Sequence, residues 1–247
     1  MRGLWKLASV EAKLFAREPM GMFFTLAFPL VMLFCFGGIY GNKPGSAGPG
    51  LGMVDISVPG YIAMVISMTG IFLLPIRMAQ YREQGILRRL RVTTVRPPTV
   101  LAAQLIVLFV MTLLGTALLI AVGRGLYHLR PPSSSLGIGG ALALCMLSFF
   151  AFGFMIAGVA GTTRTAQVIA MVLFYPMLFL SGASIPSKDL PEVIRHYNQA
   201  MPLTHVVTLL RGIWYGEAWG HHLTEVAVLG GLMVIGVVVS AITFRWE

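Results

Sequence analysis

The chain has 247 residues, of which 57% are hydrophobic and 11% are charged, and its formal net charge is +9. Six apolar runs leave little length for a soluble domain, and no GxxxxGK[ST] motif for holding ATP phosphates is present. Both cysteines, Cys35 and Cys145, fall inside apolar runs, so we expect packing residues there and neither a disulfide nor a metal site. The composition predicts a polytopic membrane protein that is not an enzyme.

The apolar runs have the length of membrane spans. A helix that crosses the hydrocarbon core needs about 20 mainly apolar residues. Inside lipid the backbone must satisfy its own hydrogen bonds, so each run is predicted to be a helix. The predicted fold class is therefore all-α, with a single transmembrane domain over residues 1–247. The six spans are expected near 21–40, 59–76, 99–122, 136–160, 165–181 and 223–244.

The basic residues predict the orientation. Six spans place both termini on one side, and twelve of the 18 lysines and arginines fall on that side, six of them within 77–98. Cytoplasmic loops carry such an excess, so both termini are expected in the cytoplasm, and nucleic acid is not expected as a partner. Trp214 and Trp219 are expected at the outer interface. The remaining six cations fall outside: Lys43, Arg124, Arg130, Lys188, Arg195 and Arg211.

Residues 1–18 are predicted to form an amphipathic helix that lies in the membrane interface against lipid headgroups and ends at Pro19. Glu11 and Glu18, seven residues apart, lie within its apolar sector, where lipid would reject them. They either meet a basic partner, for which the arginine-rich loop of this same chain is a candidate, or tilt toward water. Its basic residues gather in one sector: Arg2, Lys6, Lys13 and Arg17.

Two loops differ in character. The outer loop at about 41–58 is rich in glycine and proline and is predicted to be short and irregular. On the cytoplasmic side, residues 82–92 are predicted to form about two helical turns, which Pro97 and Pro98 follow at the start of the next helix. This pattern favours a docking element for a partner, and an ordinary positively charged loop remains the alternative.

Two further segments have unusual patterns. The fourth span carries Gly153, Ala157 and Gly161 at four-residue spacing, which permits close approach of another helix, either of this chain or of a second subunit. The outer segment 183–215 contains two short apolar helices around Pro202, the second with Thr204 as its expected cap. These helices are too short to span, so the segment is predicted to dip into the outer leaflet if protein shields it. A loop lying flat on the membrane is the alternative.

These segments resemble the membrane subunits of type-II ABC exporters, also called ABC-2-type permeases, over essentially the whole chain. The run from Glu11 to Pro19, with Phe28-Pro29-Leu30 after it, resembles the family's interfacial connecting helix and first span. The run from Arg82 to Leu90 resembles the E-x-G-x-L stretch of its coupling helix, although Thr93-Thr94-Val95 replaces a common Thr-Pro-Val. The outer re-entrant signature is matched by Ser181-Gly182, Pro186, Leu190-Pro191, Met201-Pro202-Leu203-Thr204 and Leu210-Arg211-Gly212.

The resemblance implies an exporter subunit of the bacterial inner membrane. A separate ATP-binding subunit would hold ATP and Mg²⁺ and grip the coupling helix, so this chain would bind no cofactor itself. A second permease chain, identical or paralogous, would complete the pump. The implicated coupling-helix residues are Glu83, Gly85, Ile86, Leu87, Arg88, Arg89 and Leu90. The implicated interfacial and outer-gate residues are Glu11, Arg17, Pro186, Pro191, Pro202, Thr204 and Arg211.

Other functions fit the sequence less well. A secondary transporter usually needs ionisable groups near the bilayer midplane, and no Asp or Glu lies at a span centre. An outer-face enzyme would have to use the outer histidines and acids, which show no HExxH spacing, so we expect neither catalytic nor metal residues. An ATP-independent channel or an assembly scaffold remains the alternative. Spans rich in Phe and Met without buried charge favour an apolar or amphiphilic substrate, although such side chains also suit plain packing.

Overall fold

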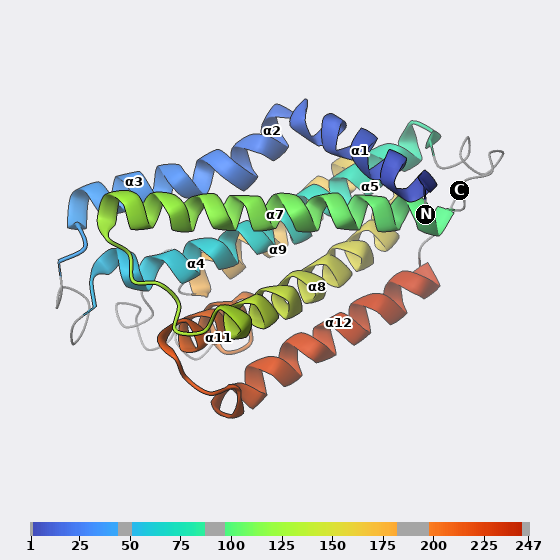
Figure 1. Cartoon of the computed structure of the whole chain (residues 1–247). Coiled ribbons are helices and arrows are strands. Elements are labelled where there is room, and N and C mark those ends of the chain that lie inside the picture. The colour runs from blue at the N-terminus through green and yellow to red at the C-terminus, as the bar shows by residue number, and fades with distance from the viewer. Residues whose placement is uncertain (1, 44–50, 87–96, 182–197, 244–247) are drawn as a thin grey trace.

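The protein is a bundle of helices in a computed structural model that describes residues 2–43, 51–86, 97–181 and 198–243. Within these ranges six helical spans are long and apolar enough to cross a membrane, which confirms the predicted all-α class and its six spans. The spans run along the long axis of the molecule, and the two chain termini lie at the same end (Figure 1). We call this end the termini end and the opposite end the loop end.

The spans include straight and interrupted helices. The first span consists of α2 (Pro19–Met22), the π-helix η1 (Phe23–Ala27) and α3 (Phe28–Tyr40). The second consists of α4 (Met53–Ser67), the π-helix η2 (Met68–Leu73) and α5 (Leu74–Glu83). The other spans are α7 (Pro97–Tyr127), α8 (Ser135–Val159), α9 (Thr163–Leu180) and α12 (Leu223–Thr243). Outside the spans lie α1 (Arg2–Ala16), α11 (Pro202–Tyr215) and the 3-10 helix η4 (Trp219–His222).

The second span is longer than the sequence predicts. It covers residues 53–83 instead of 59–76, so the expected loop at 41–58 is wrong in its last six positions. Nearly all of the central residues of this span are buried by other helices, whereas most of the sixth span faces outward. Polar residues such as Asp55 and Arg77 therefore find partners inside the protein, and the helix continues through them. Their low hydropathy made the span appear shorter.

Prolines account for the two π-helical interruptions. In η1 the amide of Phe28 bonds to the Phe23 carbonyl, and Pro29 follows directly. The second span repeats this arrangement, since the amide of Leu74 bonds to the carbonyl of Thr69 just before Pro75. A proline has no amide to donate to the preceding turn, so the hydrogen-bond pattern shifts by one residue upstream. Such bulges occur frequently at functional sites.

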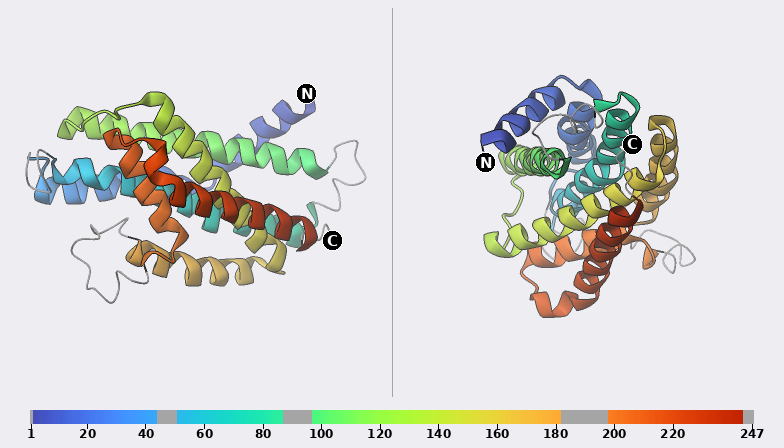
Figure 2. Two further views of the ribbon diagram at one scale, coloured as in Figure 1. Left: turned by 90° about the horizontal axis from the view of Figure 1, so that it is seen from below. Right: turned by 90° about the vertical axis from the view of Figure 1, so that its right-hand side faces the viewer.

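Close helix packing answers the question left open by the small-residue stripe. Gly153 of α8 faces Gly70 of η2, and a Cβ atom built on Gly153 would lie only 2.1 Å from the Gly70 carbonyl oxygen. The stripe therefore packs against the second span of the same chain at this position. Gly161, in contrast, has no atom within 4 Å of such a Cβ. On its other side α8 packs along α12, as both views of Figure 2 show.

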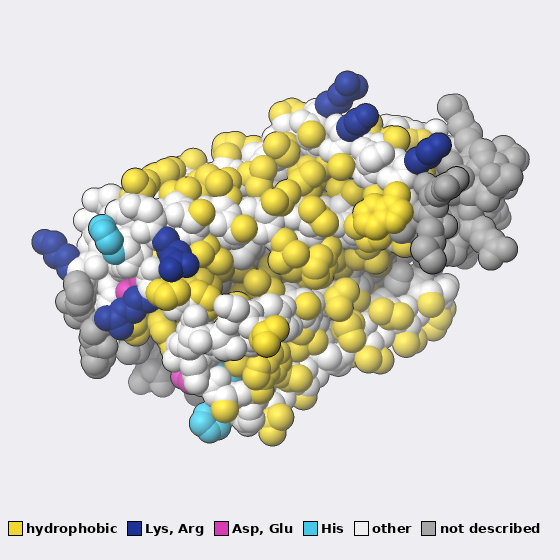
Figure 3. Space-filling model, viewed as in Figure 1, with side chains coloured by type: hydrophobic (Ala, Val, Ile, Leu, Met, Phe, Trp, Pro, Cys, Tyr) yellow, Lys and Arg dark blue, Asp and Glu magenta, His cyan; other side chains and the backbone are white. Residues whose placement is uncertain are grey.

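The surface has the polarity of a membrane protein. Apolar side chains cover the middle of the face shown in Figure 3, and lysines and arginines gather toward its two ends. Helix α1 packs on α7 at the termini end, with Ala8, Glu11 and Phe15 buried and Lys6 and Lys13 exposed. The helix ends at Ala16, before Pro19, as the sequence predicts.

Candidate functional site

A buried ion-pair cluster joins α1 to α5 at the termini end. Arg77, which is only 5% exposed, donates from Nη2 to Glu18 Oε2 at 2.8 Å. Its Nη1 lies 3.8 Å from Glu11 Oε2, and the hydroxyl of Tyr81 donates to both oxygens of Glu11. The guanidinium also lies over the ring of Phe15, with Cζ 5.3 Å from the ring centroid.

This cluster decides between the two alternatives for the acidic residues of α1. Glu11 and Glu18 meet a basic residue of the segment 77–98, as one alternative held. Sequence reasoning did not identify the partner itself, although Arg77 and Tyr81 are four residues apart and so share one helix face. Arg17, the other interfacial residue of interest, is exposed just after the end of α1.

The last turn of α5 holds the connection between α8 and α9. Arg82 donates to the carbonyl oxygens of Ala160 at 2.9 Å and Ala157 at 3.1 Å, where a cation complements the C-terminal end of α8. Glu83 accepts from the amide of Thr163 at 3.0 Å and also from its hydroxyl. A carboxylate at the first residue of α9 satisfies an amide that the helix leaves unpaired.

The expected coupling helix is wrong at its beginning. Arg82 and Glu83 belong to α5, and a turn at Gln84 and Gly85 ends that helix. Gly85 has a φ of 66°, in the left-handed region that glycine adopts readily after a helix. A docking helix could therefore begin no earlier than Ile86, which is half-buried. The other expected contact residues, Leu87, Arg88, Arg89 and Leu90, lie outside the described residues.

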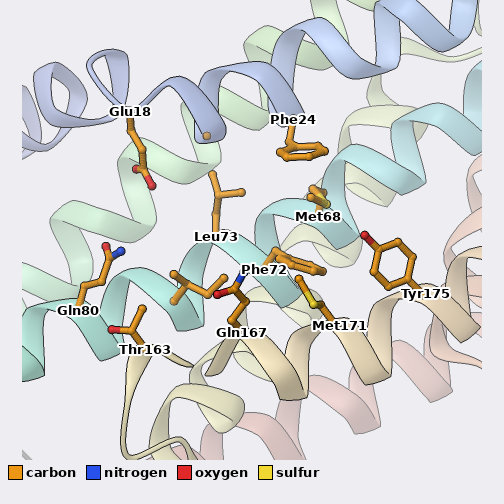
Figure 4. A pocket seen from close by; sticks show the side chains of 12 residues that line it. Glu18, Phe24, Met68, Phe72, Leu73, Gln80, Thr163, Gln167, Met171 and Tyr175 are labelled. Atoms are coloured by element: carbon orange, nitrogen blue, oxygen red, sulfur yellow. The ribbon is translucent and has the colours of Figure 1, made fainter. Parts of the chain in front are cut away.

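A cavity of about 300 Å³ lies between the first, second and fifth spans (Figure 4). Glu18, Gln80 and Thr163 lie on one side of it, and Phe24, Met68 and Tyr175 lie on the other. Its apolar lining in the first two spans comes largely from the π-helical segments η1 and η2. The volume is at the lower limit of small-molecule sites, about 300 to 1,000 Å³. The cavity thus offers an apolar wall with a polar edge, an arrangement that suits an amphiphilic molecule.

Helix α11 is enclosed by protein at the loop end. It packs against α4, α8 and α12, which bury side chains such as Val207 and Leu210. Arg211 donates from Nε to the carbonyl of Ile56 at 3.2 Å. This enclosure supplies the shielding that a re-entrant segment requires, and the re-entrant position itself stays a prediction. Pro186 and Pro191 lie outside the described residues.

One expectation for α11 is wrong. The helix begins at Pro202 with Met201 as its cap, so Thr204 does not cap it; the Thr204 hydroxyl instead donates to the carbonyl of Asn198 at 2.7 Å. A proline suits the first helical position because no amide is needed there. Trp214 is buried by protein, and its Nε1 donates to the carbonyl of Arg130 at 3.2 Å, so its expected place at the outer interface stays a prediction. A tryptophan with a hydrogen-bond partner can be buried in this way.

Sequence reasoning missed a polar junction around Asp55, which is 3% exposed. Its carboxylate accepts from Asn42 Nδ2 at 3.2 Å and from the amides of Gly52 and Arg130 at 3.1 Å each. Asn42 also accepts from the Asp55 amide and donates to the carbonyl of Tyr127. The junction ties together the ends of the first, second and third spans. An acidic residue three positions after Gly52 is the local signal for its capping role.

Comparison with known proteins places these features in a family. The chain is 26% identical over 190 residues to the inner membrane transport permease YhhJ of Escherichia coli K12, which covers 71% of this chain and 49% of that protein. It is 23% identical over 161 residues to the probable multidrug ABC transporter permease YbhR of the same organism, over 65% of this chain and 44% of the relative. It is also 22% identical over 198 residues to the daunorubicin resistance ABC transporter permease protein DrrB1 of Streptomyces coeruleorubidus, over 78% and 66% of the two chains.

The matched regions are partial on the side of the relatives. The chain spans about half the length of the first two curated relatives that it matches. The sequence pattern of the ABC-2 type transporter family itself matches residues 2–215, a range that includes the Arg77 cluster, the end of α5, the cavity and α11. The protein is therefore a multi-pass membrane protein that belongs to the ABC-2 type transporter family.

Proposed function

We propose that this chain is the permease subunit of an ATP-driven exporter in the bacterial inner membrane, with both termini in the cytoplasm. One observation carries the proposal. Glu18 and Thr163 both line the cavity, and the same two residues bond to Arg77 and Glu83 of α5. If the chain that follows Glu83 is displaced, the Arg77–Glu18 and Glu83–Thr163 contacts would therefore transmit the movement to the cavity lining.

A separate ATP-binding subunit would drive that displacement and would hold the ATP and Mg²⁺. It would dock on the residues that follow Gly85, where Ile86, Leu87 and Leu90 offer apolar surface and Arg88 and Arg89 offer charge. Full burial of each such apolar side chain contributes roughly 1.5–3 kcal/mol. Glu83, whose carboxylate oxygens already meet Thr163, would act through α9 and not by reaching the partner.

The docking proposal has a direct test. Leu87→Asp places a charge in the proposed apolar contact, so the ATP-binding subunit should no longer co-purify with the permease, while the permease stays in the membrane. The matched control is Gln84→Asp, which places the same charge at an exposed position before Gly85. Normal co-purification and normal export by Leu87→Asp would show that the partner docks elsewhere.

The substrate that fits the cavity best is an apolar or amphiphilic molecule. Its apolar groups would contact Phe24, Met68 and Phe72, and its polar groups would lie near Gln80 and Thr163. The names of two relatives, a probable multidrug permease and a daunorubicin resistance permease, support a drug-like substrate. A second permease chain would cover the open side of the cavity and complete the path.

Daunorubicin, which is fluorescent and amphiphilic, can test the cavity. Met171→Trp should fill the cavity and weaken daunorubicin binding to the purified permease by about tenfold, since that loss corresponds to one or two lost apolar contacts. Val172→Trp is the matched control, because Val172 is 66% exposed and is not part of the cavity wall. Equal binding by the two variants would place the substrate site elsewhere.

Transport measurements separate the exporter from the alternative functions. In vesicles that contain both subunits, daunorubicin transport should require ATP and should stop when ATP is omitted. Transport by the permease alone, without ATP, would favour an ATP-independent channel. Absence of any ATP-binding subunit that co-purifies with the chain would favour an assembly scaffold.

A further inference from the structure

The basic residues at the loop end gather where the positive-inside pattern does not explain them. Lys43, Arg124 and Arg130 all lie at the ends of the first and third spans, and all three are exposed. They make up half of the six cations that the predicted topology assigns to the outer side. Figure 3 shows lysine, arginine and histidine side chains together at this end of the bundle.

An open cavity of about 490 Å³ lies beside Lys43 and Arg130. Lys43, His128 and Arg130 contribute its basic lining, and Leu126 and Tyr127 contribute its apolar lining. It is separate from the cavity between the first, second and fifth spans, with which it shares no residue. A small anionic group would thus find two permanent cations, an imidazole and an apolar wall within one depression.

The one acidic residue that lines this cavity is already engaged. Asp55 accepts hydrogen bonds from Asn42 and from the amides of Gly52 and Arg130, so its oxygens are occupied by neutral donors. Because the Arg130 amide holds Asp55, the backbone at Arg130 is fixed beside the cavity while its side chain stays exposed. The junction therefore positions the basic lining. Asp55 carries one negative charge, whereas Lys43 and Arg130 carry two positive charges, so the lining keeps a net positive charge.

The backbone conformation next to the cavity is also unusual. His128 has a φ of 53° and is, among the described residues, the only non-glycine residue with a positive φ. This conformation is costly for a residue with a Cβ atom, and such residues concentrate at functional sites. It ends α7 and turns the chain so that both His128 and Arg130 line the cavity.

The neighbouring surface is apolar and exposed. Ile39 near the end of α3 is 73% exposed, and Leu126 near the end of α7 is 60% exposed. Leu126 belongs to the cavity lining as well, so the basic cavity continues directly into an exposed apolar surface. A ligand held here would have an anionic group beside the cations and hydrocarbon beside Ile39 and Leu126.

We propose that this cavity binds the phosphate headgroup of an anionic phospholipid, with Lys43 and Arg130 as the charged contacts and the acyl chains along α3 and α7. Hydrogen bonds between such cations and phosphate oxygens are charge-assisted and stronger than neutral ones. All residues of the proposed site lie at the loop end, so the proposal does not depend on which leaflet of the membrane that end faces. It is also independent of the ATP-binding subunit and of the transported substrate.

Native mass spectrometry of the full chain can test the site with phosphatidylglycerol as the probe. The wild-type chain should retain phosphatidylglycerol in preference to phosphatidylcholine at equal supply. The variant with both Lys43→Gln and Arg130→Gln should retain about tenfold less phosphatidylglycerol, the loss expected from weakening charged hydrogen bonds. The matched control carries Arg124→Gln and Arg164→Gln, which remove the same charge from exposed positions that do not line the cavity.

The outcomes separate the lipid from other anions. Equal loss in both double variants would mean a general effect of net charge and would overturn the site. Displacement of the bound lipid by millimolar inorganic phosphate would assign the cavity to free phosphate and overturn the lipid assignment. If the Lys43 and Arg130 variant does not fold, the wild-type comparison still decides, because equal retention of the two lipids would contradict the proposal.

Discussion

The two ends of the bundle both bury acidic side chains, but they satisfy them by different means. At the termini end, Glu11 and Glu18 depend on the single guanidinium of Arg77 and on the Tyr81 hydroxyl. At the loop end, Asp55 accepts from three neutral N–H groups, two of which belong to the backbone. A change in one side chain can therefore disrupt the first arrangement, whereas the second is held by the positions of several chain segments.

This difference suggests where the molecule can move. Helix α1 joins α5 through side chains that can rearrange without unfolding any helix, and the same region leads to the proposed docking residues. The loop end is closed by buried groups such as Trp214, whose indole bonds to a backbone carbonyl. We therefore expect the termini end to transmit motion and the loop end to anchor the spans.

The largest effect should come from Arg77→Ala. This variant leaves the buried carboxylate of Glu11 without its cation, and breaking a buried pair in this way costs about 3–5 kcal/mol. Thermal unfolding in detergent should show the loss, and Arg164→Ala, at an exposed position, should stay within about 0.5 kcal/mol of wild type.

A second variant can show that the Arg77 effect is electrostatic. Arg77→Leu together with Glu11→Gln and Glu18→Gln removes all three charges, so no unpaired buried charge is left and most of the lost stability should return. If Arg77→Ala unfolds at the same temperature as Arg164→Ala, the termini end does not depend on its cation, and the contrast between the two ends fails.

The next effect in size should come from Asp55→Ala. The substitution leaves the amides of Gly52 and Arg130 without their acceptor, and an unsatisfied buried donor costs about 1–3 kcal/mol. Asp55→Asn keeps one acceptor oxygen and should lose less. Both variants can be compared by thermal unfolding in detergent, and equal losses for Asp55→Asn and Asp55→Ala would mean that charge, not hydrogen bonding, matters here.

A third variant tests how tightly the helices pack in the middle of the bundle, between the two ends. Gly153→Ala introduces a Cβ atom against the Gly70 carbonyl, and such overpacking costs about 1–3 kcal/mol. Gly161→Ala lies at the termini end of the same stripe, where a Cβ would meet no atom within 4 Å. Unfolding temperatures of the two variants should therefore differ, and equal values would mean that α8 and η2 separate easily.

The smallest effect on stability, but a clear effect on transport, is expected for Glu83→Gln and Thr163→Val. If Glu83 acts through α9, each variant should reduce export, and the double variant should reduce it by less than the two single effects combined, because both weaken the same contact. Export and co-purification of the ATP-binding subunit should be measured together. Normal export by Thr163→Val with loss of the ATP-binding subunit in Glu83→Gln would instead place Glu83 in direct contact with the partner.

Much of this protein follows from the sequence alone. Hydropathy over about 20 residues is a local property, and it predicted six spans, two termini on one side and the interfacial helix ended by Pro19. The unusual position of Glu11 and Glu18 in an apolar sector also made a basic partner one of the two alternatives. The family was evident from motifs at three separate places along the chain.

Tertiary structure alone decided which groups meet. The same polar residues that appeared to end the second span are buried and paired, since neighbouring helices replace both water and lipid around Asp55 and Arg77. Arg82 and Glu83 hold residues about 80 positions away, and Lys43 and Arg130 line one cavity from two different spans. Such contacts depend on how each helix is rotated and packed against its neighbours, and the pattern within one segment does not contain that information.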